Sequence, residues 1–259
     1  NIDYVLMGTV IQEVRTSNLA RECAIGAGIP KNVPASTVTM ACISSNLSIT
    51  TAAEKILAGQ ANACIAGGAE TFSDVPIRFS KKMRSNMLKS QKVKGVLGKL
   101  GAVFKGVKAK DIAPEAPAIA NFATGEVMGS SSDRLSQRFG VTRQEMDEFA
   151  LASHQNAAAA HDAGKFEDEI IPINGNVLDN GIKRDSTLEK LSSLRPAFIR
   201  PHGTHTGGNS SFLTDGASAT LIMSEETALV GFCLYIFPLF SPHPLFYFFF
   251  LVGNSGTRL

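Results

Sequence analysis

The sequence has few cysteines, and their spacing argues against both a disulfide framework and a structural zinc site. Only four occur in 259 residues: Cys23, Cys42, Cys64 and Cys233. They form no Cys-x-x-Cys pair, whereas disulfide frameworks and structural zinc sites need cysteines at short, regular spacing. The pattern therefore predicts no metal site and favours a reducing compartment.

The chain also has little net charge. It carries 25 Lys or Arg against 23 Asp or Glu, a formal charge of +2, with 44% hydrophobic residues and 23 glycines. This composition is typical of a soluble α/β protein, and not of a disordered or a globally nucleic-acid-binding chain. Any electrostatic function must therefore be local. The length suffices for one large or two modest domains with a sizeable core.

The N-terminus lacks the marks of a targeting segment. The chain begins at Asn1 without an initiator methionine, a charged n-region or an apolar h-region. No targeting signal can be read from it. We expect the natural N-terminus to lie further upstream.

Strand and helix patterns alternate in the first 70 residues. Residues 4–12, 36–41 and 61–70 read as strands, while helices are expected from Asn18 to about Gly28 and from Ser44 or Ser45 to Gly59. This alternation predicts a parallel sheet flanked by helices, with right-handed crossovers. A late strand at 217–226 could rejoin the same sheet.

A basic segment follows at residues 78–110. Eleven Lys or Arg residues occur there with no acidic residue, and apolar residues recur at steps of three and four. The segment predicts one or two basic amphipathic helices, which suit an anionic membrane surface. A solvated face that packs on its own domain explains the pattern equally well. Nucleic acid is disfavoured, because few aromatic residues interleave with the charges.

The next segment is expected to be helical from Glu126 to Ala163. Thr142 and Glu145 form the sequence signature of a capping box at the start of one of these helices. Residues 166–180 then read as a strand and a turn.

The last 32 residues differ in composition from the rest. Residues 228–259 are apolar and nearly uncharged, which would suffice in length for a membrane span, but Pro238, Pro242 and Pro244 would break a helix there. We interpret this segment as an aberrant tail, either translated intron or a faulty gene model.

Cys42 lies between an expected strand and an expected helix. A thiol at a helix N-terminus meets the helix dipole and free N–H groups, both of which favour the thiolate. Cys42 is thus a candidate nucleophile, although a buried structural cysteine is the commoner outcome for such a residue. Cys23, inside an expected helix, and Cys64, inside an expected strand, are interpreted as structural.

Four sequence motifs indicate which protein family the chain resembles. VTMACISSN (38–46), AGGAETFSDVPIR (66–78), EVMGSSSDRL (126–135) and GGNSSFLTDGASATLIMSEE (207–226) together resemble the thiolase family. The resemblance covers residues 4–227. Within the family, residues 73–84 look most like the β-subunits of mitochondrial trifunctional fatty-acid oxidation proteins.

The resemblance implies a chemistry for these residues. Cys42 would attack a 3-ketoacyl-CoA at the 3-keto carbon, release acetyl-CoA and hold the shortened acyl group as a thioester until CoA accepts it. Coenzyme A would be a co-substrate, with no bound cofactor. Met128, Gly207 and Ser211 would line the pantetheine arm of CoA. The alternative interpretations are helix core for Met128, a tight turn for Gly207 and a strand-entry hydroxyl for Ser211.

The sequence also departs from the family pattern. The activating histidine of thiolases lies in a Gly-His-Pro motif, of which only the Pro-His-Pro at 242–244 is a partial match. His154, His202 and His205 are not assigned to that role. The Cys-x-Gly and Asn-Glu-Ala-Phe motifs are absent from the 259 residues. Removing cooperating catalytic groups lowers the reaction rate by orders of magnitude. We therefore expect this polypeptide to be inactive on its own.

The resemblance finally implies an organisation and a setting. Residues 1–75 and 212–227 would form an incomplete thiolase N-terminal domain, a mixed sheet between helices, and residues 76–211 an inserted loop domain. The second thiolase half would be absent. The implied partners are acyl-CoA, CoA, a trifunctional-protein α-subunit and a homodimer partner, in the mitochondrial matrix or at its inner membrane. A ketoacyl-synthase-like condensing enzyme, and a non-catalytic fragment that binds a partner or a membrane through 78–110, remain alternatives.

Overall fold

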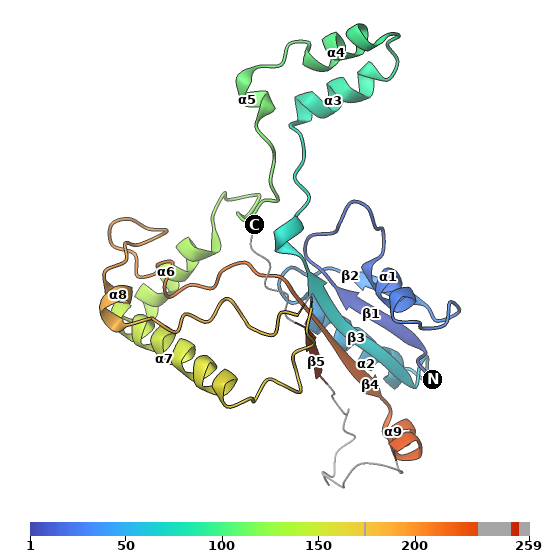
Figure 1. Ribbon diagram of the computed structural model, residues 1–259, viewed down its shortest axis with the longest axis vertical. Helices are drawn as coiled ribbons and strands as arrows, with labels where there is room; N and C mark the ends of the chain where they lie inside the picture. Colours follow the sequence, from blue (N-terminus) through green and yellow to red (C-terminus); the bar gives the residue numbers. More distant parts are fainter. Residues whose placement is uncertain (174, 233–249, 254–259) are drawn as a thin grey trace. The chain divides into compact units, whose positions relative to one another are not determined.

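A mixed five-stranded sheet forms the centre of the computed structural model (Figure 1), which describes residues 1–173, 175–232 and 250–253. The strand order is β2-β1-β3-β4-β5. The strands are β1 Tyr4–Gly8, β2 Ala35–Val38, β3 Ala63–Glu70, β4 Gly216–Met223 and β5 Phe250–Gly253. β2, β1 and β3 are parallel, whereas β4 runs antiparallel to β3 and β5 antiparallel to β4. The expected mixed α/β sheet, including its late strand, is confirmed.

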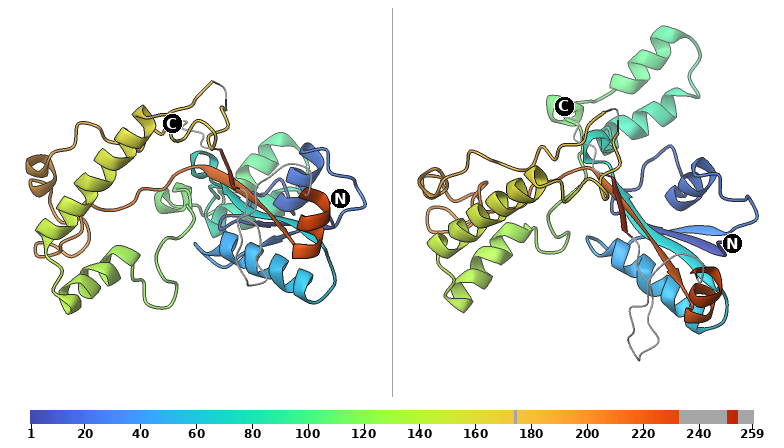
Figure 2. Two further views of the ribbon diagram at one scale, coloured as in Figure 1. Left: turned by 90° about the horizontal axis from the view of Figure 1, so that it is seen from below. Right: turned by 60° about the horizontal axis from the view of Figure 1, so that its bottom comes forward.

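Two helices lie on opposite faces of this sheet (Figure 2): α1, Leu19–Gly26, and α2, Ser44–Leu57. Side chains alternate between the faces of a strand. Val5 and Met7 of β1 accordingly pack with α1, while Leu6 packs in the cluster that includes Ala52 of α2. The buried cores on both faces therefore hold the two helices against the sheet, although the strands are short.

The start of α2 rests directly on glycines of the sheet. A Cβ atom built on Gly8 would lie 2.4 Å from the carbonyl carbon of Ser44, and one on Gly68 would lie 2.2 Å from Oγ of Ser45. The Ser48 hydroxyl also lies 2.7 Å from the carbonyl oxygen of Gly67. Only glycine allows so close an approach. The N-terminus of α2 is therefore fixed at the carboxyl ends of β1 and β3.

Four further helices belong to the same unit, which comprises residues 1–73 and the chain from Glu126 onward. They are α6 Met128–Phe139, α7 Arg143–Asp162, α8 Leu188–Ser192 and α9 Glu225–Phe232. α7 begins with the predicted capping box, in which the Thr142 N–H donates to Glu145 at 2.7 Å and the Glu145 N–H donates to the Thr142 hydroxyl at 3.2 Å. α6 ends at Gly140, whose φ of +67° is a left-handed cap.

Residues 74–125 form a second, helical unit. It contains α3 Lys81–Ser90, α4 Val96–Phe104 and α5 Ala109–Ile112. The sequence predicted one or two helices in the basic segment, and the short α5 was not predicted. Asn86 of α3 donates to the carbonyl oxygens of Val103 and Lys105, each at 2.9 Å, and so joins α3 to the end of α4. Arg84 bonds Glu115 at 3.1 Å.

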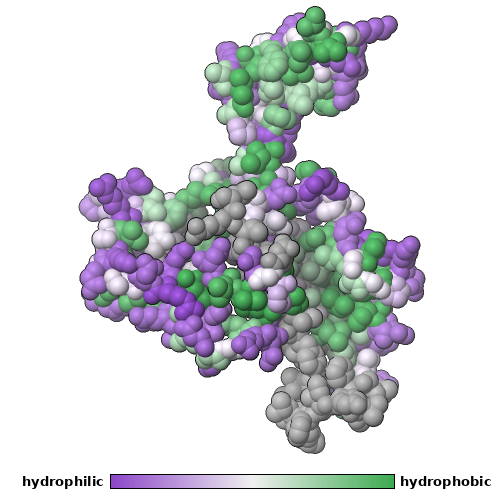
Figure 3. All heavy atoms as spheres, viewed as in Figure 1, coloured by the Kyte–Doolittle hydropathy of each residue, from purple (hydrophilic) through white to green (hydrophobic). Residues whose placement is uncertain are grey.

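Apolar side chains remain exposed on this second unit. Leu88 of α3 is 66% exposed, and Val96 and Leu97 of α4 are 76% and 86% exposed. The lysines of the segment lie among them, so that hydrophobic and hydrophilic surfaces adjoin on this unit (Figure 3). Taken by itself, the unit presents a basic and apolar surface to its surroundings.

Several boundaries differ from the sequence-based expectation. The first two strands end earlier than expected: β1 ends at Gly8, before the segment that leads to α1, and β2 ends at Val38, before the turn into α2. The strand expected within 166–180 was wrong: among the described residues there, only an isolated bridge joins Ile173 to Asn176. β4 stops at Met223, and residues 225 and 226, expected to end the strand, begin α9.

The predicted aberrant tail lies mostly outside the described residues. Of residues 228–259, the structure describes only the end of α9 and β5. Within the described part of the chain, no helix is both long and apolar enough to cross a membrane.

Candidate active site at the start of α2

Cys42 is exposed, in the turn that joins β2 to α2. The preceding residue, Ala41, has a φ of +46°, which is the left-handed region that residues other than glycine rarely adopt. Such strain persists only where surrounding contacts enforce it, and it is concentrated at functional sites. The turn therefore presents Cys42 in a conformation that the local sequence alone would not favour.

Side-chain hydrogen bonds hold this turn. The Ser44 hydroxyl accepts from the Met40 N–H at 2.9 Å and donates to the Ala41 carbonyl oxygen at 2.6 Å. α2 begins at Ser44, as the sequence predicted, and its N-cap is Ile43. The Ser44 side chain stabilises the strained residue before Cys42.

The strand ends beside the turn are also fixed. The Thr39 hydroxyl donates to the Thr9 carbonyl oxygen at 2.6 Å. Glu70, at the end of β3, accepts from the N–H groups of Val10 at 2.7 Å and Ile11 at 3.0 Å. Three strand ends are thus joined where ligands typically bind in α/β sheets, at their carboxyl edge.

The helix start supplies hydrogen-bond donors next to Cys42. In the described part of the chain, the N–H groups of Ser45 and Asn46 meet no acceptor, which is usual for the first turn of a helix. Such donors stabilise a negative charge nearby. A thiolate at Cys42, or an oxyanion formed on a group attached to it, is chemically suited to this position.

The other two described cysteines differ from Cys42. Cys64 is fully buried in β3, and burial raises the pKa of its thiol to about 11. Cys23 is half-buried in α1, and burial raises its pKa as well. A raised pKa leaves less thiolate, the reactive form of cysteine. The interpretation of both residues as structural stays a prediction.

The three residues expected at the CoA arm lie on α6 and on the segment before β4. Met128 is the first residue of α6 and is 66% exposed. Gly207 lies in an exposed turn with nothing within 4 Å of a Cβ built on it, and the hydroxyl of exposed Ser211 donates to the Phe212 carbonyl oxygen at 3.2 Å. In the described residues, no hydrogen bond or ion pair joins them to Cys42.

A buried aspartate connects α6 to the segment before Gly207. Asp133 accepts from the N–H groups of Ile199 at 3.1 Å, Thr204 at 2.9 Å and His205 at 2.9 Å, and also contacts His205 Nδ1 at 2.9 Å. Burial by itself would raise the pKa of Asp133, but these bonds outweigh it and hold the pKa at about 2. His205 Nε2 in turn lies 2.8 Å from the Ser132 hydroxyl.

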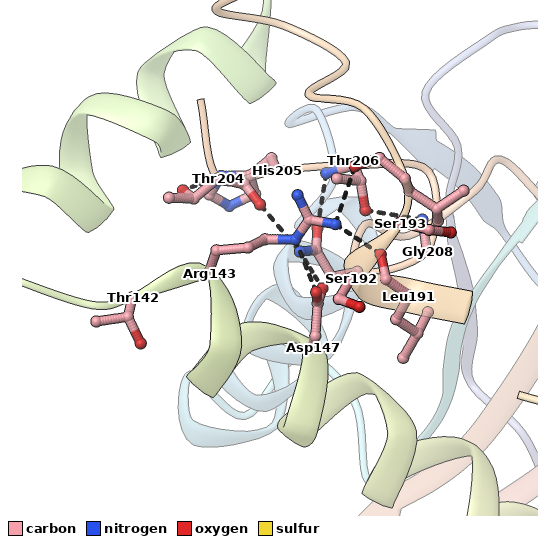
Figure 4. Close-up of polar contacts among 12 residues, drawn as sticks. Thr142, Arg143, Asp147, Leu191, Ser192, Ser193, Thr204, His205, Thr206 and Gly208 are labelled. Atoms are coloured by element: carbon pink, nitrogen blue, oxygen red, sulfur yellow. Dashed lines mark hydrogen bonds and ion pairs between the residues drawn. The ribbon is translucent and has the colours of Figure 1, made fainter. Parts of the chain in front are cut away.

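A second buried aspartate fixes the turn that contains Gly207 (Figure 4). Asp147 of α7 is 1% exposed and accepts from Arg143 at 2.8 Å and from Asn209 at 2.9 Å. Arg143 also donates to the Leu191 carbonyl oxygen of α8 at 2.6 Å. Asn209 accepts from the Thr206 N–H at 2.8 Å and so closes the turn around Gly207.

Comparison with known proteins identifies the fold and the family. A family model described as the N-terminal domain of thiolase matches residues 1–226. The chain belongs to the thiolase family. A crystal structure of acetyl-CoA acetyltransferase from Bacillus anthracis, 32% identical, superposes with a TM-score of 0.70 over 88% of this chain and 55% of that one.

Individual relatives are more similar in sequence than this structure. A probable 3-ketoacyl-CoA thiolase of Caenorhabditis elegans is 53% identical over 89% of this chain and 52% of that protein. The mitochondrial trifunctional enzyme subunit beta of Homo sapiens is 52% identical over 88% of this chain and 48% of that subunit. The chain thus spans about half the length of the curated relatives it matches.

The thiolase motifs had pointed to Cys42, but they did not reveal the residues that shape its surroundings. Ala41 carries no unusual side chain, and Glu70 is a charged residue at a strand end, so neither stands out in the sequence. These two residues, like Asp133 and Asn209 near the expected CoA arm, lie inside the matching motifs without a role assigned to them there. Asp133 is an acidic residue that directly follows three serines within an expected helix, and this is the signal by which it could have been found.

Proposed function

We propose that this thiolase chain carries the nucleophile of a 3-ketoacyl-CoA thiolase of fatty-acid β-oxidation, and that the nucleophile is Cys42. The observation that carries the proposal is its exposed position on a strained turn before α2. Beside it lie the donors of the helix start and the carboxyl ends of three strands. The names of its relatives favour a thiolase over a ketoacyl synthase.

The proposed chemistry follows from the thiol. The Cys42 thiolate adds to the 3-keto carbon of a 3-ketoacyl-CoA, the bond between C2 and C3 breaks, and the C2 carbanion takes a proton to leave as acetyl-CoA. The shortened acyl group stays on Cys42 as a thioester. CoA thiolate then attacks this thioester and restores the Cys42 thiol after proton transfer. Sulfur suits both steps, because it is a good nucleophile and a good leaving group.

CoA is proposed as a co-substrate, held along its pantetheine arm by Met128, Gly207 and Ser211. An exposed methionine gives an adaptable apolar surface. A glycine with open space above its Cα lets a slender ligand approach the backbone. In this proposal, residues 76–211 form an inserted loop domain, and residues 1–75 and 212–227 form the domain that bears the nucleophile.

We propose that the 259-residue polypeptide alone does not complete a catalytic cycle. Proton transfer to the acetyl-CoA carbanion and activation of the thiol need an acid and a base, for which the family uses motifs not found in this sequence. Thioester exchange is less demanding, because it needs only a thiolate and stabilisation of the tetrahedral oxyanion. The polypeptide should therefore accept an acyl group without completing thiolysis.

The acyl-acceptor role is tested by single-turnover transfer from radiolabelled acetyl-CoA. We expect one acetyl group per chain, on the Cys42 peptide, as a thioester that neutral hydroxylamine releases. The Cys42→Ser variant should retain no label, and neither protein should cleave acetoacetyl-CoA repeatedly. Label on Cys23, or equal label in the variant, would contradict the role of Cys42, and steady cleavage by the wild type alone would contradict the proposed lack of turnover.

A second role is proposed for the basic helical unit. Its exposed Leu88, Val96 and Leu97 beside lysines fit the interface of an anionic membrane, with the apolar side chains inserted and the lysines at the headgroups. By resemblance to trifunctional enzyme β-subunits, the setting would be the mitochondrion, with an α-subunit and a second copy as partners. In this proposal, lipid binding by the basic helical unit decides whether the protein lies in the matrix or at the inner membrane.

Membrane binding is tested by co-sedimentation with vesicles that contain anionic lipid. Changing Lys89, Lys92 and Lys94 to glutamate should weaken binding more than about tenfold, since each lysine near such a surface contributes ~1 kcal/mol. All three are exposed, and the ion pair of Arg84 with Glu115 is left intact. The matched control changes the exposed Lys31, Lys165 and Lys183. Equal binding by both triple variants would refute the membrane role.

A further inference from the structure

Three side chains form a continuous hydrogen-bonded relay between the two segments assigned to the CoA arm. Asp133 and Ser132 lie on α6, which begins at Met128, and His205 lies two residues before Gly207. Asp133 Oδ1 is 2.9 Å from His205 Nδ1, and His205 Nε2 is 2.8 Å from Ser132 Oγ. Both Asp133 and His205 are well buried, with side-chain exposures of 2% and 15%.

The partners in this relay fix where the protons lie. Asp133 is ionised and can only accept, so His205 Nδ1 must carry the hydrogen of the bond between them. In the neutral ring, Nε2 is then an acceptor, and the Ser132 hydroxyl donates to it. The lone pairs of Ser132 Oγ stay available to a third group. Ser132 is thus oriented as an acceptor instead of rotating freely.

Ser132 also faces the same way as Met128. The two residues are four positions apart on α6, which places them one above the other on one face of the helix. Ser132 is half-buried, so its oxygen remains within reach of a ligand that crosses this face. The pantetheine arm of CoA carries two secondary amides, each with one N–H donor, separated by short apolar segments. An apolar Met128 followed by an acceptor matches that alternation.

We propose that Ser132 is a further contact of the CoA arm, accepting a hydrogen bond from one pantetheine amide N–H, and that Asp133 positions it through His205. This inference rests on the proposed CoA site at Met128, Gly207 and Ser211. Asp133 itself does not touch the ligand. Its role is to fix the His205 tautomer and, through it, the direction of the Ser132 hydroxyl.

The contact is tested by calorimetric titration of the 259-residue protein with CoA. Ser132→Ala should weaken CoA binding about fivefold, the usual effect of losing one neutral hydrogen bond. Because the bond to His205 is lost as well, its thermal midpoint should fall by a few degrees at most. The matched control is Ser131→Ala, because Ser131 is the adjacent serine and is exposed, and its hydroxyl donates to Glu126 at 2.8 Å and not to His205. Control and wild type should bind CoA equally.

The positioning role of Asp133 is tested by a measurement that does not respond to a loss of stability alone, the tautomer of His205. In Asp133→Asn, the ring ¹⁵N resonances of His205 should lose the signature of a single Nδ1-protonated tautomer. CoA affinity should fall about as far as in Ser132→Ala, and the double variant should bind no more weakly than Asp133→Asn alone. Additive losses, or an unchanged His205 tautomer, would show that Asp133 does not act through Ser132.

Failure of this inference can be told apart from failure of the CoA site. If Met128→Ala and Ser211→Ala weaken CoA binding while Ser132→Ala does not, the proposed contact is wrong and the CoA site stands. If none of the three variants changes CoA affinity, or if the wild type does not bind CoA, the proposed site itself is wrong and the contact with it.

Discussion

Gly8→Ala is expected to destabilise the protein by about 3 kcal/mol or more and to disturb the Cys42 turn. The added methyl group would lie 2.4 Å from the carbonyl carbon of Ser44 and 2.6 Å from the N atom of Ser45. Both are backbone atoms at the start of α2, so relief requires the helix start to move away from β1. Urea unfolding measures the loss of stability, and the alkylation rate of Cys42 measures the change at the turn.

The matched control for this substitution is Gly26→Ala at the end of α1. No atom lies within 4 Å of a Cβ built there, and Gly26 does not have a positive φ. Its effect should lie within about 0.5 kcal/mol of zero. If Gly8→Ala behaved like this control, α2 would not rest on β1 as described, and the explanation for the position of Cys42 would be lost.

Asp133→Asn is expected to remove a pH-dependent part of the stability. The folded-state pKa of about 2 lies below the ordinary value of 3.8. The stability from Asp133 is therefore fully present above pH 4 and is lost as the pH falls through 2. The shift corresponds to about 2 kcal/mol. Urea unfolding of wild type and variant between pH 5 and pH 2 should give free energies that differ most at pH 5 and converge at pH 2.

Asp185→Asn provides the control for this pH dependence. Asp185 is 84% exposed and pairs with Lys190 at 2.9 Å on the surface. Exposed ion pairs contribute little to stability, so its unfolding curve should follow that of the wild type at every pH. A difference between Asp133→Asn and wild type that stays constant with pH would mean that Asp133 is not held ionised by its hydrogen bonds.

Much of the fold could be predicted from local patterns. The buried runs around β1 and β3, Asn18 at the start of α1 and the Thr142–Glu145 box at the start of α7 are signals carried by neighbouring residues, and the structure has all of them. The strand expected in 166–180 failed, because an apolar and polar alternation does not show whether a partner strand exists. Pairing depends on distant residues, which a local pattern does not contain.

The site could be predicted only in part for a similar reason. Family motifs indicated Cys42, Met128, Gly207 and Ser211. They did not indicate the strain at Ala41, which arises from the Ser44 hydrogen bonds and from the packing of α2 on Gly8 and Gly68. Nor did they indicate that Asp133, 72 residues before His205, binds it. Such features come from tertiary contacts between segments that are remote in sequence.

The central claim is that Cys42 is a reactive thiol at the end of a CoA site, and alkylation by bromoacetyl-CoA tests it most directly. The Cys42 thiolate would displace bromide without help from an acid or a base. We expect Cys42 to react about tenfold or more faster with bromoacetyl-CoA than with bromoacetamide, because bound CoA raises the local concentration of the reagent. Free CoA should protect it, while Cys23 and Cys64 stay unmodified. Equal rates with both reagents and no protection by CoA would contradict the account.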